Sequence, residues 1–217
     1  VAAAAAAAAP PSLKAVSLAC LLPTLLGYYK SEYGVSYAYG SAVAAVSFLA
    51  LRSLPRSTVL PHPTTVAAFH ALSVVFYGVR LCAFLLYREA FVPRFRRMRE
   101  RIEDRAKARG GRFARTPFIL SCAGLYGCMA APVLVTSALM GDVPMLSPGK
   151  DWADSAAVVA VVVAWCGFLL GALGDVTKSY SKALNGEDHL VTGGVFSVFR
   201  HPNYTGEVIG WVANSAA

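Results

Sequence analysis

Long runs of apolar residues, separated by short polar or charged segments, alternate along this chain. Each run has the length, roughly 20 residues, that a helix needs to cross the hydrocarbon core of a bilayer. The runs lie at about 12–29, 35–54, 65–87, 117–140 and 155–174, and a sixth begins at 203. A backbone in lipid must satisfy its own hydrogen bonds. The pattern therefore predicts an all-α fold: a polytopic transmembrane helix bundle with about six membrane helices.

The composition and the alanine-rich start of the chain indicate the expected domain organisation. Hydrophobic residues make up 56% of the chain and charged residues 15%, which excludes an ordinary soluble domain. A low-complexity, alanine-rich segment at 1–11 precedes the predicted transmembrane domain at 12–217. Such a segment suits the remnant of an organelle-targeting sequence. A plastid or mitochondrial membrane is therefore expected, and the endoplasmic reticulum is equally compatible.

Most of the net charge lies in one predicted connection, the basic loop at 93–116. Residues 94–115 hold ten Arg or Lys against three Asp or Glu, and so seven of the chain's eight net positive charges. By the positive-inside rule this loop faces the cytosol, stroma or matrix, where it can contact anionic lipid headgroups. The flanking membrane spans argue against a nucleic-acid partner.

Metal and disulfide chemistry have little support in the sequence. The five cysteines all lie in apolar runs, and no two of them form a C-x-x-C pair. Buried, inert thiols are the expected state, and no metal site is predicted.

The strongest concentration of chemistry lies at 190–211, LVTGGVFSVFRHPNYTGEVIGW. Pro202 suits the first turn of a helix, on which Asn203 and Glu207, four residues apart, share one face. A glutamate inside an apolar helix is costly and indicates a functional site. The free N–H groups of that first turn, beside Arg200 and His201, favour an anion.

This stretch resembles the signature of the steroid 5α-reductase-like membrane proteins, and within them the DUF1295 group. The matching residues are Gly194-Val195-Phe196 and RHPNYTGE at 200–207, and the resemblance extends over roughly 63–211. It implies an oxidoreductase that uses NADPH to reduce a conjugated C=C bond in a lipophilic, steroid- or isoprenoid-like substrate. The cofactor-binding residues that it implies are Asp175, Lys178, Arg200, His201, Asn203, Tyr204 and Glu207.

A second resemblance lies in the third predicted helix. The run FYGVRLCAFLLYR at 76–88 is similar to the family's W-G-x-R-L-x-x-F-L-x-x-R helix. The match implies that Tyr77 is the proton donor and that Arg80 assists it. Two departures stand out: Ser53 and Gly171 occupy places where the family has a glutamate.

Two other functions fit the same residues. Arg200, His201, Pro202 and Tyr204 also match isoprenylcysteine carboxyl methyltransferases, which use S-adenosylmethionine. The missing glutamates, and a sequence that stops just inside the sixth helix, instead favour a non-catalytic subunit. Such a pseudoenzyme would bind no cofactor and would pack with other subunits of a larger organellar membrane complex.

Overall fold

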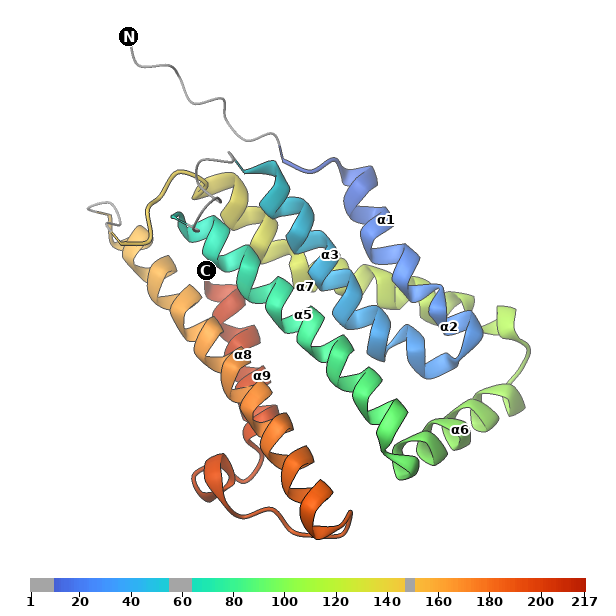
Figure 1. Ribbon diagram of the computed structural model, residues 1–217. Coiled ribbons are helices and arrows are strands. Elements are labelled where there is room, and N and C mark those ends of the chain that lie inside the picture. The colour runs from blue at the N-terminus through green and yellow to red at the C-terminus, as the bar shows by residue number, and fades with distance from the viewer. Residues whose placement is uncertain (1–9, 55–63, 147–150) are drawn as a thin grey trace. The chain divides into compact units, whose positions relative to one another are not determined.

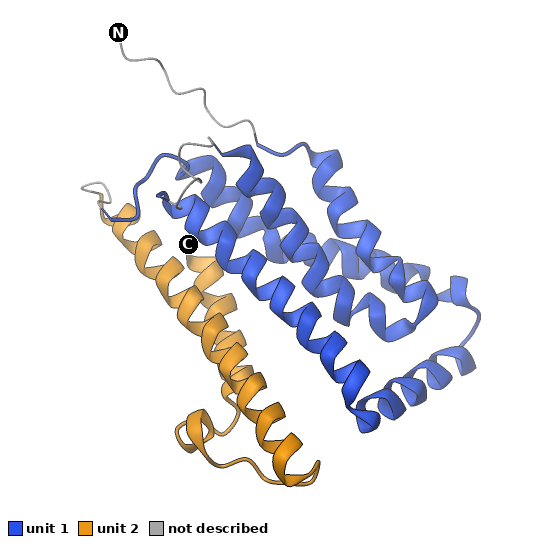
Figure 2. Cartoon of the chain, in the orientation of Figure 1, with its two compact units in different colours: residues 1–147 blue, residues 148–217 orange. Residues whose placement is uncertain are grey.

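The computed structural model describes residues 10–54, 64–146 and 151–217. They fall in two compact units, which divide between Ser147 and Pro148 (Figures 1 and 2). Helices dominate both units, and no strand occurs in the three described ranges. The predicted all-α class is therefore confirmed. Most of the alanine-rich segment lies outside the described residues, and the division into 1–11 and 12–217 stays a prediction.

The helices of the apolar runs begin within a few residues of their predicted positions. The helix Trp152–Asn185 continues past the predicted end near 174, and a further helix, Pro93–Ala108, lies within the predicted basic loop. Those of unit 1 are α1 (Leu13–Thr24), α2 (Leu26–Tyr29), η1 (Ser31–Gly34), α3 (Ser36–Ser53), α5 (Val66–Phe91), α6 (Pro93–Ala108), η2 (Arg112–Arg115) and α7 (Thr116–Leu139). Those of unit 2 are α8 (Trp152–Asn185), η3 (Gly194–Ser197) and α9 (Pro202–Ala216).

Among the described residues, four stretches are long and apolar enough to cross a membrane: Ser31–Ser53, Val66–Phe91, Arg112–Leu139 and Trp152–Asn185. A shorter apolar stretch, Leu13–Tyr29, matches the first predicted run, and α9 begins next to the predicted start of the sixth. Large apolar side chains also point outward from these spans, for example Leu86, Leu125 and Val159. An apolar outer surface suits contact with lipid tails, and the chain fits an integral membrane protein.

Small residues bring α3 and α5 together in unit 1. A Cβ atom added at Gly40 of α3 would lie 2.9 Å from the carbonyl oxygen of Gly78 in α5. Contacts this short show that the two backbones touch, as small residues allow between membrane helices. Along α3, the side chains of Ala42, Val43 and Val46 are fully buried.

The basic connection is mostly a helix and not an open loop. Pro93 begins α6, a position where the missing N–H costs nothing. Its buried positions are Phe95, Arg99 and Glu103, four residues apart and therefore on one face. Figure 1 shows α6 leaving the end of α5 at a sharp angle and running toward α2.

Unit 2 is an antiparallel hairpin of α8 and α9 (Figure 2). A Cβ atom added at Gly167 of α8 would lie 2.8 Å from the carbonyl oxygen of Gly206, and one added at Gly206 would lie 2.9 Å from the Cα of Gly171. The glycines at 167 and 171 thus permit close approach of the neighbouring helix.

The expectation of five buried thiols is wrong for part of the set. Cys20 and Cys122 are buried, whereas Cys82 is half-buried and Cys128 and Cys166 are exposed. The reason is that an apolar run in a membrane helix has an outward face, so an apolar position need not be covered by protein.

Candidate functional site

Three segments of unit 2 converge where α9 begins. A Cβ atom added at Gly174 of α8 would lie 2.7 Å from the backbone nitrogen of Asn203, so the start of α9 abuts α8 there. The next residue, Asp175, is buried, with 8% of its surface exposed. A Cβ atom at Gly194 would lie 3.5 Å from Cγ2 of Thr177, which brings the connecting segment to the same part of α8.

This convergence places the predicted cofactor residues in one region of one unit. Asn203 and Glu207 are half-buried on α9, whereas Arg200, His201 and Tyr204 are exposed. The rings of His201 and Tyr204 lie 6.2 Å apart in an edge-to-face arrangement. We call this region the α8–α9 site: Asp175, Lys178, Arg200, His201, Asn203, Tyr204 and Glu207.

The α8–α9 site combines charges of both signs near a helix N-terminus. Lys178, Arg200 and His201 are exposed and can meet a phosphate group. The first-turn N–H groups of α9 also favour an anion such as phosphate, because the positive end of the helix dipole lies there. The carboxylates of Asp175 and Glu207 can accept hydrogen bonds from hydroxyl or amide groups.

The two predicted catalytic residues lie in unit 1, on α5. The side chain of Tyr77 is fully buried, and its hydroxyl donates a hydrogen bond of 3.2 Å to the hydroxyl of Tyr39 on α3. The guanidinium carbon of Arg80 lies 5.1 Å from the centre of the Tyr77 ring. The ring of Tyr39 is also 5.5 Å from that of Tyr126 on α7. Tyr77 and Arg80 thus lie together beside a tyrosine cluster (Tyr39, Tyr77 and Tyr126), in which Tyr77 and Tyr126 are buried and Tyr39 is half-buried.

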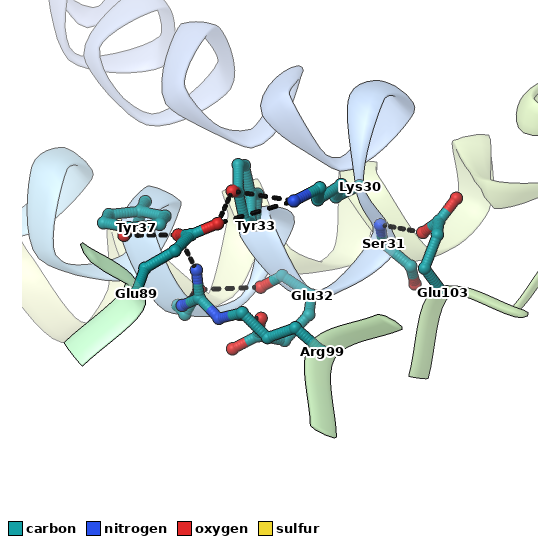
Figure 3. Close-up of polar contacts among 9 residues, drawn as sticks. Lys30, Ser31, Glu32, Tyr33, Tyr37, Glu89, Arg99 and Glu103 are labelled. Carbon is teal, nitrogen blue, oxygen red and sulfur yellow. Dashed lines mark hydrogen bonds and ion pairs between the residues drawn. The ribbon is translucent and has the colours of Figure 1, made fainter. Parts of the chain in front are cut away.

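A second polar cluster, which the sequence analysis missed, holds α6 against η1 and α3 (Figure 3). At its centre, Nε of Arg99 lies 2.6 Å from Oε2 of Glu32, and Nη1 of Arg99 pairs with Glu89. The hydroxyls of Tyr33 and Tyr37 both donate to Glu89, the latter over 2.8 Å. We call these five residues the arginine clamp.

The Arg99 guanidinium is enclosed by aromatic rings as well as by carboxylates. Its central carbon lies 4.5 Å from the ring centre of Phe95, 4.8 Å from that of Tyr37 and 5.0 Å from that of Tyr33. Only 2% of the Arg99 side chain is exposed. Cation–π contacts of this kind strengthen when the cation is desolvated, so the surroundings fit a fixed structural arginine.

A second ion pair secures the other end of α6. Nη2 of Arg115 lies 2.9 Å from Oε1 of Glu103, and the Ser31 N–H donates to Glu103 over 2.8 Å. Burial alone would raise the pKa of Glu103. The hydrogen bonds from Arg115 and Ser31, together with the charge of Arg115, outweigh burial and hold the pKa of Glu103 below its usual value.

This lowered pKa predicts a loss of stability in acid. Because the folded-state pKa lies below the unfolded value of about 4.3, Glu103 stabilises the fold above that pH and loses its contribution as the pH falls through the folded-state pKa. The unfolding midpoint of Glu103→Gln should lie below that of the unmodified protein at pH 7. The gap between the two unfolding midpoints should narrow below about pH 4.

Thermal unfolding in detergent between pH 7 and pH 3 measures this difference. Glu100→Gln is the matched control, because Glu100 is exposed on the same helix. A gap of constant size across the whole range would contradict the prediction.

Within the described ranges, no three His, Cys, Asp or Glu residues are grouped so that they could hold a metal ion. A family model described as a protein of unknown function, DUF1295, matches residues 28–217. No curated protein and no solved structure matches the chain. The match begins well before residue 63, where the resemblance was expected to begin, and includes both the arginine clamp and the α8–α9 site.

Proposed function

Since the chain belongs to the DUF1295 family, we propose that it is a membrane-embedded reductase. The reaction is the NADPH-dependent reduction of a C=C bond conjugated with a carbonyl, in a lipophilic substrate such as a steroid or an isoprenoid. The proposal rests on the resemblance of its motifs to those of steroid 5α-reductase-like proteins. One observation carries it: the segments around Asp175 and Asn203, far apart in sequence, adjoin at the Gly174 contact.

The α8–α9 site has the groups that a phosphate-bearing dinucleotide requires. Arg200, His201 and Lys178 would face its phosphates, because they are exposed and carry or can acquire positive charge. Asp175 and Glu207 would accept hydrogen bonds from its hydroxyl and amide groups. When bound, NADPH supplies the hydride.

Tyr77 would supply the proton. Its hydroxyl is held by Tyr39, and the guanidinium carbon of Arg80 lies 5.1 Å from the centre of its ring. Because Tyr77 has no exposed surface, the substrate would have to displace a neighbour within the tyrosine cluster to reach it. The second hydroxyl, that of Tyr39, could then return a proton to Tyr77.

Cofactor titration of the purified, detergent-solubilised protein tests the proposal. NADPH should bind, and Asn203→Ala and Glu207→Gln should each weaken its binding about tenfold or more, since a lost hydrogen bond to a charged group costs about 1.5–3 kcal/mol. Ser215→Ala is the control, because Ser215 is exposed near the other end of α9 and only bonds its own helix. In an assay of NADPH oxidation with a panel of lipophilic enones, Tyr77→Phe should keep cofactor binding and lose turnover.

The same titration distinguishes the other functions. Binding of S-adenosylmethionine in place of NADPH would support the methyltransferase of isoprenylcysteine type, which Arg200, His201 and Tyr204 fit equally well. Binding of neither would support the non-catalytic subunit.

One observation specifically favours that non-catalytic alternative. Gly171, at the place of a family glutamate, lies where α8 and α9 are in backbone contact through Gly206. A long carboxylate side chain could not enter between the helices there without separating them. Ser53, at the place of the other glutamate, bonds the Ala50 carbonyl of its own helix over 2.6 Å. A subunit that has lost activity, within a larger organellar membrane complex, would keep such packing.

We further propose an orientation and a location. The basic helix α6 would face the cytosol, stroma or matrix, in line with the positive-inside rule. The membrane would be that of a plastid, a mitochondrion or the endoplasmic reticulum.

A further inference from the structure

The arginines and lysines between 94 and 115 divide into two groups with different surroundings. Arg99 and Arg115 are buried and paired with carboxylates, in the arginine clamp and with Glu103. The other eight are all exposed: Arg94, Arg96, Arg97, Arg101, Arg105, Lys107, Arg109 and Arg112. Only two exposed acids, Glu100 and Asp104, accompany them. The exposed side chains of this segment therefore carry a strongly positive net charge.

The position of α6 in unit 1 relates this positive surface to the membrane boundary. The helix directly follows α5 and is followed, through η2, by α7, and both neighbours are long and apolar enough to span a membrane. The clamp and the Glu103–Arg115 pair fasten α6 to η1, at the start of α3. The segment thus lies at the end of three apolar helices, where the hydrocarbon core gives way to headgroups.

Apolar side chains flank the charges at both ends of this segment. Phe91, just before α6, is 72% exposed, and Phe113, just after it, is 84% exposed. Met98, within α6, is 38% exposed. Aromatic and apolar groups beside exposed arginines are typical of helices that lie in the membrane interface, with the charges at headgroup level.

We propose that the exposed surface of α6 and η2 binds the headgroups of anionic phospholipids. The arginine clamp fixes α6 in place, so that the eight exposed side chains meet the headgroup layer together. Each arginine can donate two parallel hydrogen bonds to a phosphate, and lipids with a net negative charge add a long-range attraction. Continuity with three membrane spans favours a lipid surface over a soluble polyanion.

Electron paramagnetic resonance of spin-labelled phospholipids tests this binding on the full chain in phosphatidylcholine bilayers. At low salt, labelled phosphatidylglycerol should associate with the protein several-fold more strongly than labelled phosphatidylcholine. The ratio should approach one at about 1 M salt, where the Debye length falls to about 3 Å. Arg96→Gln/Arg97→Gln should lower the ratio about twofold, and adding Arg101→Gln/Arg105→Gln should bring it close to one.

Lys14→Gln/Arg52→Gln is the matched control. It also removes two exposed positive charges from unit 1, at the start of α1 and the end of α3, and should leave the ratio unchanged. The salt titration of the unmodified protein does not depend on how the variants fold. A ratio near one for the unmodified protein, a ratio that persists at high salt, or an equal loss in the control would overturn the proposal. Tight binding of a short RNA, without lipid preference, would overturn it as well.

Discussion

Arg99→Ala should lower the free energy of unfolding of unit 1 by about 3 kcal/mol, because it leaves Glu32 and Glu89 without their shared cation. Removal of one partner from a buried ion pair costs about 3–5 kcal/mol. The side chains of Glu32 and Glu89 are each 20% exposed, so the expected cost lies at the lower end of that range. The aromatic contacts to Arg99 are lost as well. The first consequence should be release of α6 from η1.

Denaturant unfolding in detergent, together with limited proteolysis within α6, measures both effects. Arg97→Ala is the matched control, since Arg97 is exposed on the same helix, and it should change stability by less than about 0.5 kcal/mol. Arg99→Lys should fall between the two, because an ammonium keeps the charge without the planar fork. If charge pairing is the cause, Arg99→Ala should cost much less in a Glu32→Gln/Glu89→Gln background. An equal cost in both backgrounds would leave packing alone as the explanation.

Gly206→Leu should separate α8 from α9 and abolish the α8–α9 site. Even a Cβ atom at this position would lie 2.9 Å from the Cα of Gly171 and 2.5 Å from the carbonyl oxygen of Gly167. These are backbone atoms, so the helices themselves must move. Overpacking of this kind costs about 1–3 kcal/mol or more. Asn203 would also move away from Gly174, and NADPH binding should be lost if the proposed function is correct.

The direction of the stability change makes this prediction specific. A glycine inside a helix normally costs about 1 kcal/mol relative to alanine, so Gly→Ala in open space should stabilise. Gly124→Ala in α7 is that control, since nothing lies within 4 Å of its added Cβ atom. The unfolding midpoint should fall for Gly206→Ala and Gly206→Leu and should hold or rise for Gly124→Ala. A rise for Gly206→Ala would mean that α8 and α9 are not in backbone contact.

Hydropathy alone was enough to predict the apolar helices, because each membrane span must be apolar over its own length and needs no distant partner. It did not predict the charged helix α6, which lies in the segment expected to be a loop. The predicted run at 117–140 differs from α7 by a single residue at each end. The contact through Gly167 and Gly171 was predictable for a similar reason. Two small residues four positions apart create a flat face on a single helix, whatever the helix opposite.

The arginine clamp could not be predicted in the same way, because its members meet only after α3, α5 and α6 have packed. Tyr33 and Tyr37 alone indicate a membrane interface, and Glu89 alone is one acid at the end of an apolar run. A usable signal was present within 94–115. Phe95, Arg99 and Glu103 recur every four residues, and a helical interpretation of the basic loop would have placed them on one face.

The partners of the polar residues on α5 also could not be predicted from the sequence of that helix alone. His70, Tyr77 and Arg80 are seven and three residues apart, which puts them on one stripe of one helix. This spacing does not give their partners on other helices. In the structure, Nδ1 of His70 lies 3.0 Å from Oγ1 of Thr136 on α7, and Tyr77 meets Tyr39 on α3. Which polar groups a stripe contacts depends on helix packing, which the pattern of one helix does not contain.

If the proposed function is correct, the length of α8 bears on how the cofactor and the substrate would reach the protein. Its 34 residues extend about 51 Å, whereas the hydrocarbon layer is about 30 Å thick. About six turns suffice for the crossing, so a span that starts at Trp152 would leave the last turns, from Asp175 onward, outside the hydrocarbon layer. A highly charged dinucleotide would then bind from the aqueous phase, without entering the hydrocarbon core of the bilayer. A lipophilic substrate could enter laterally from the bilayer. Neither molecule would have to leave the phase in which it is soluble.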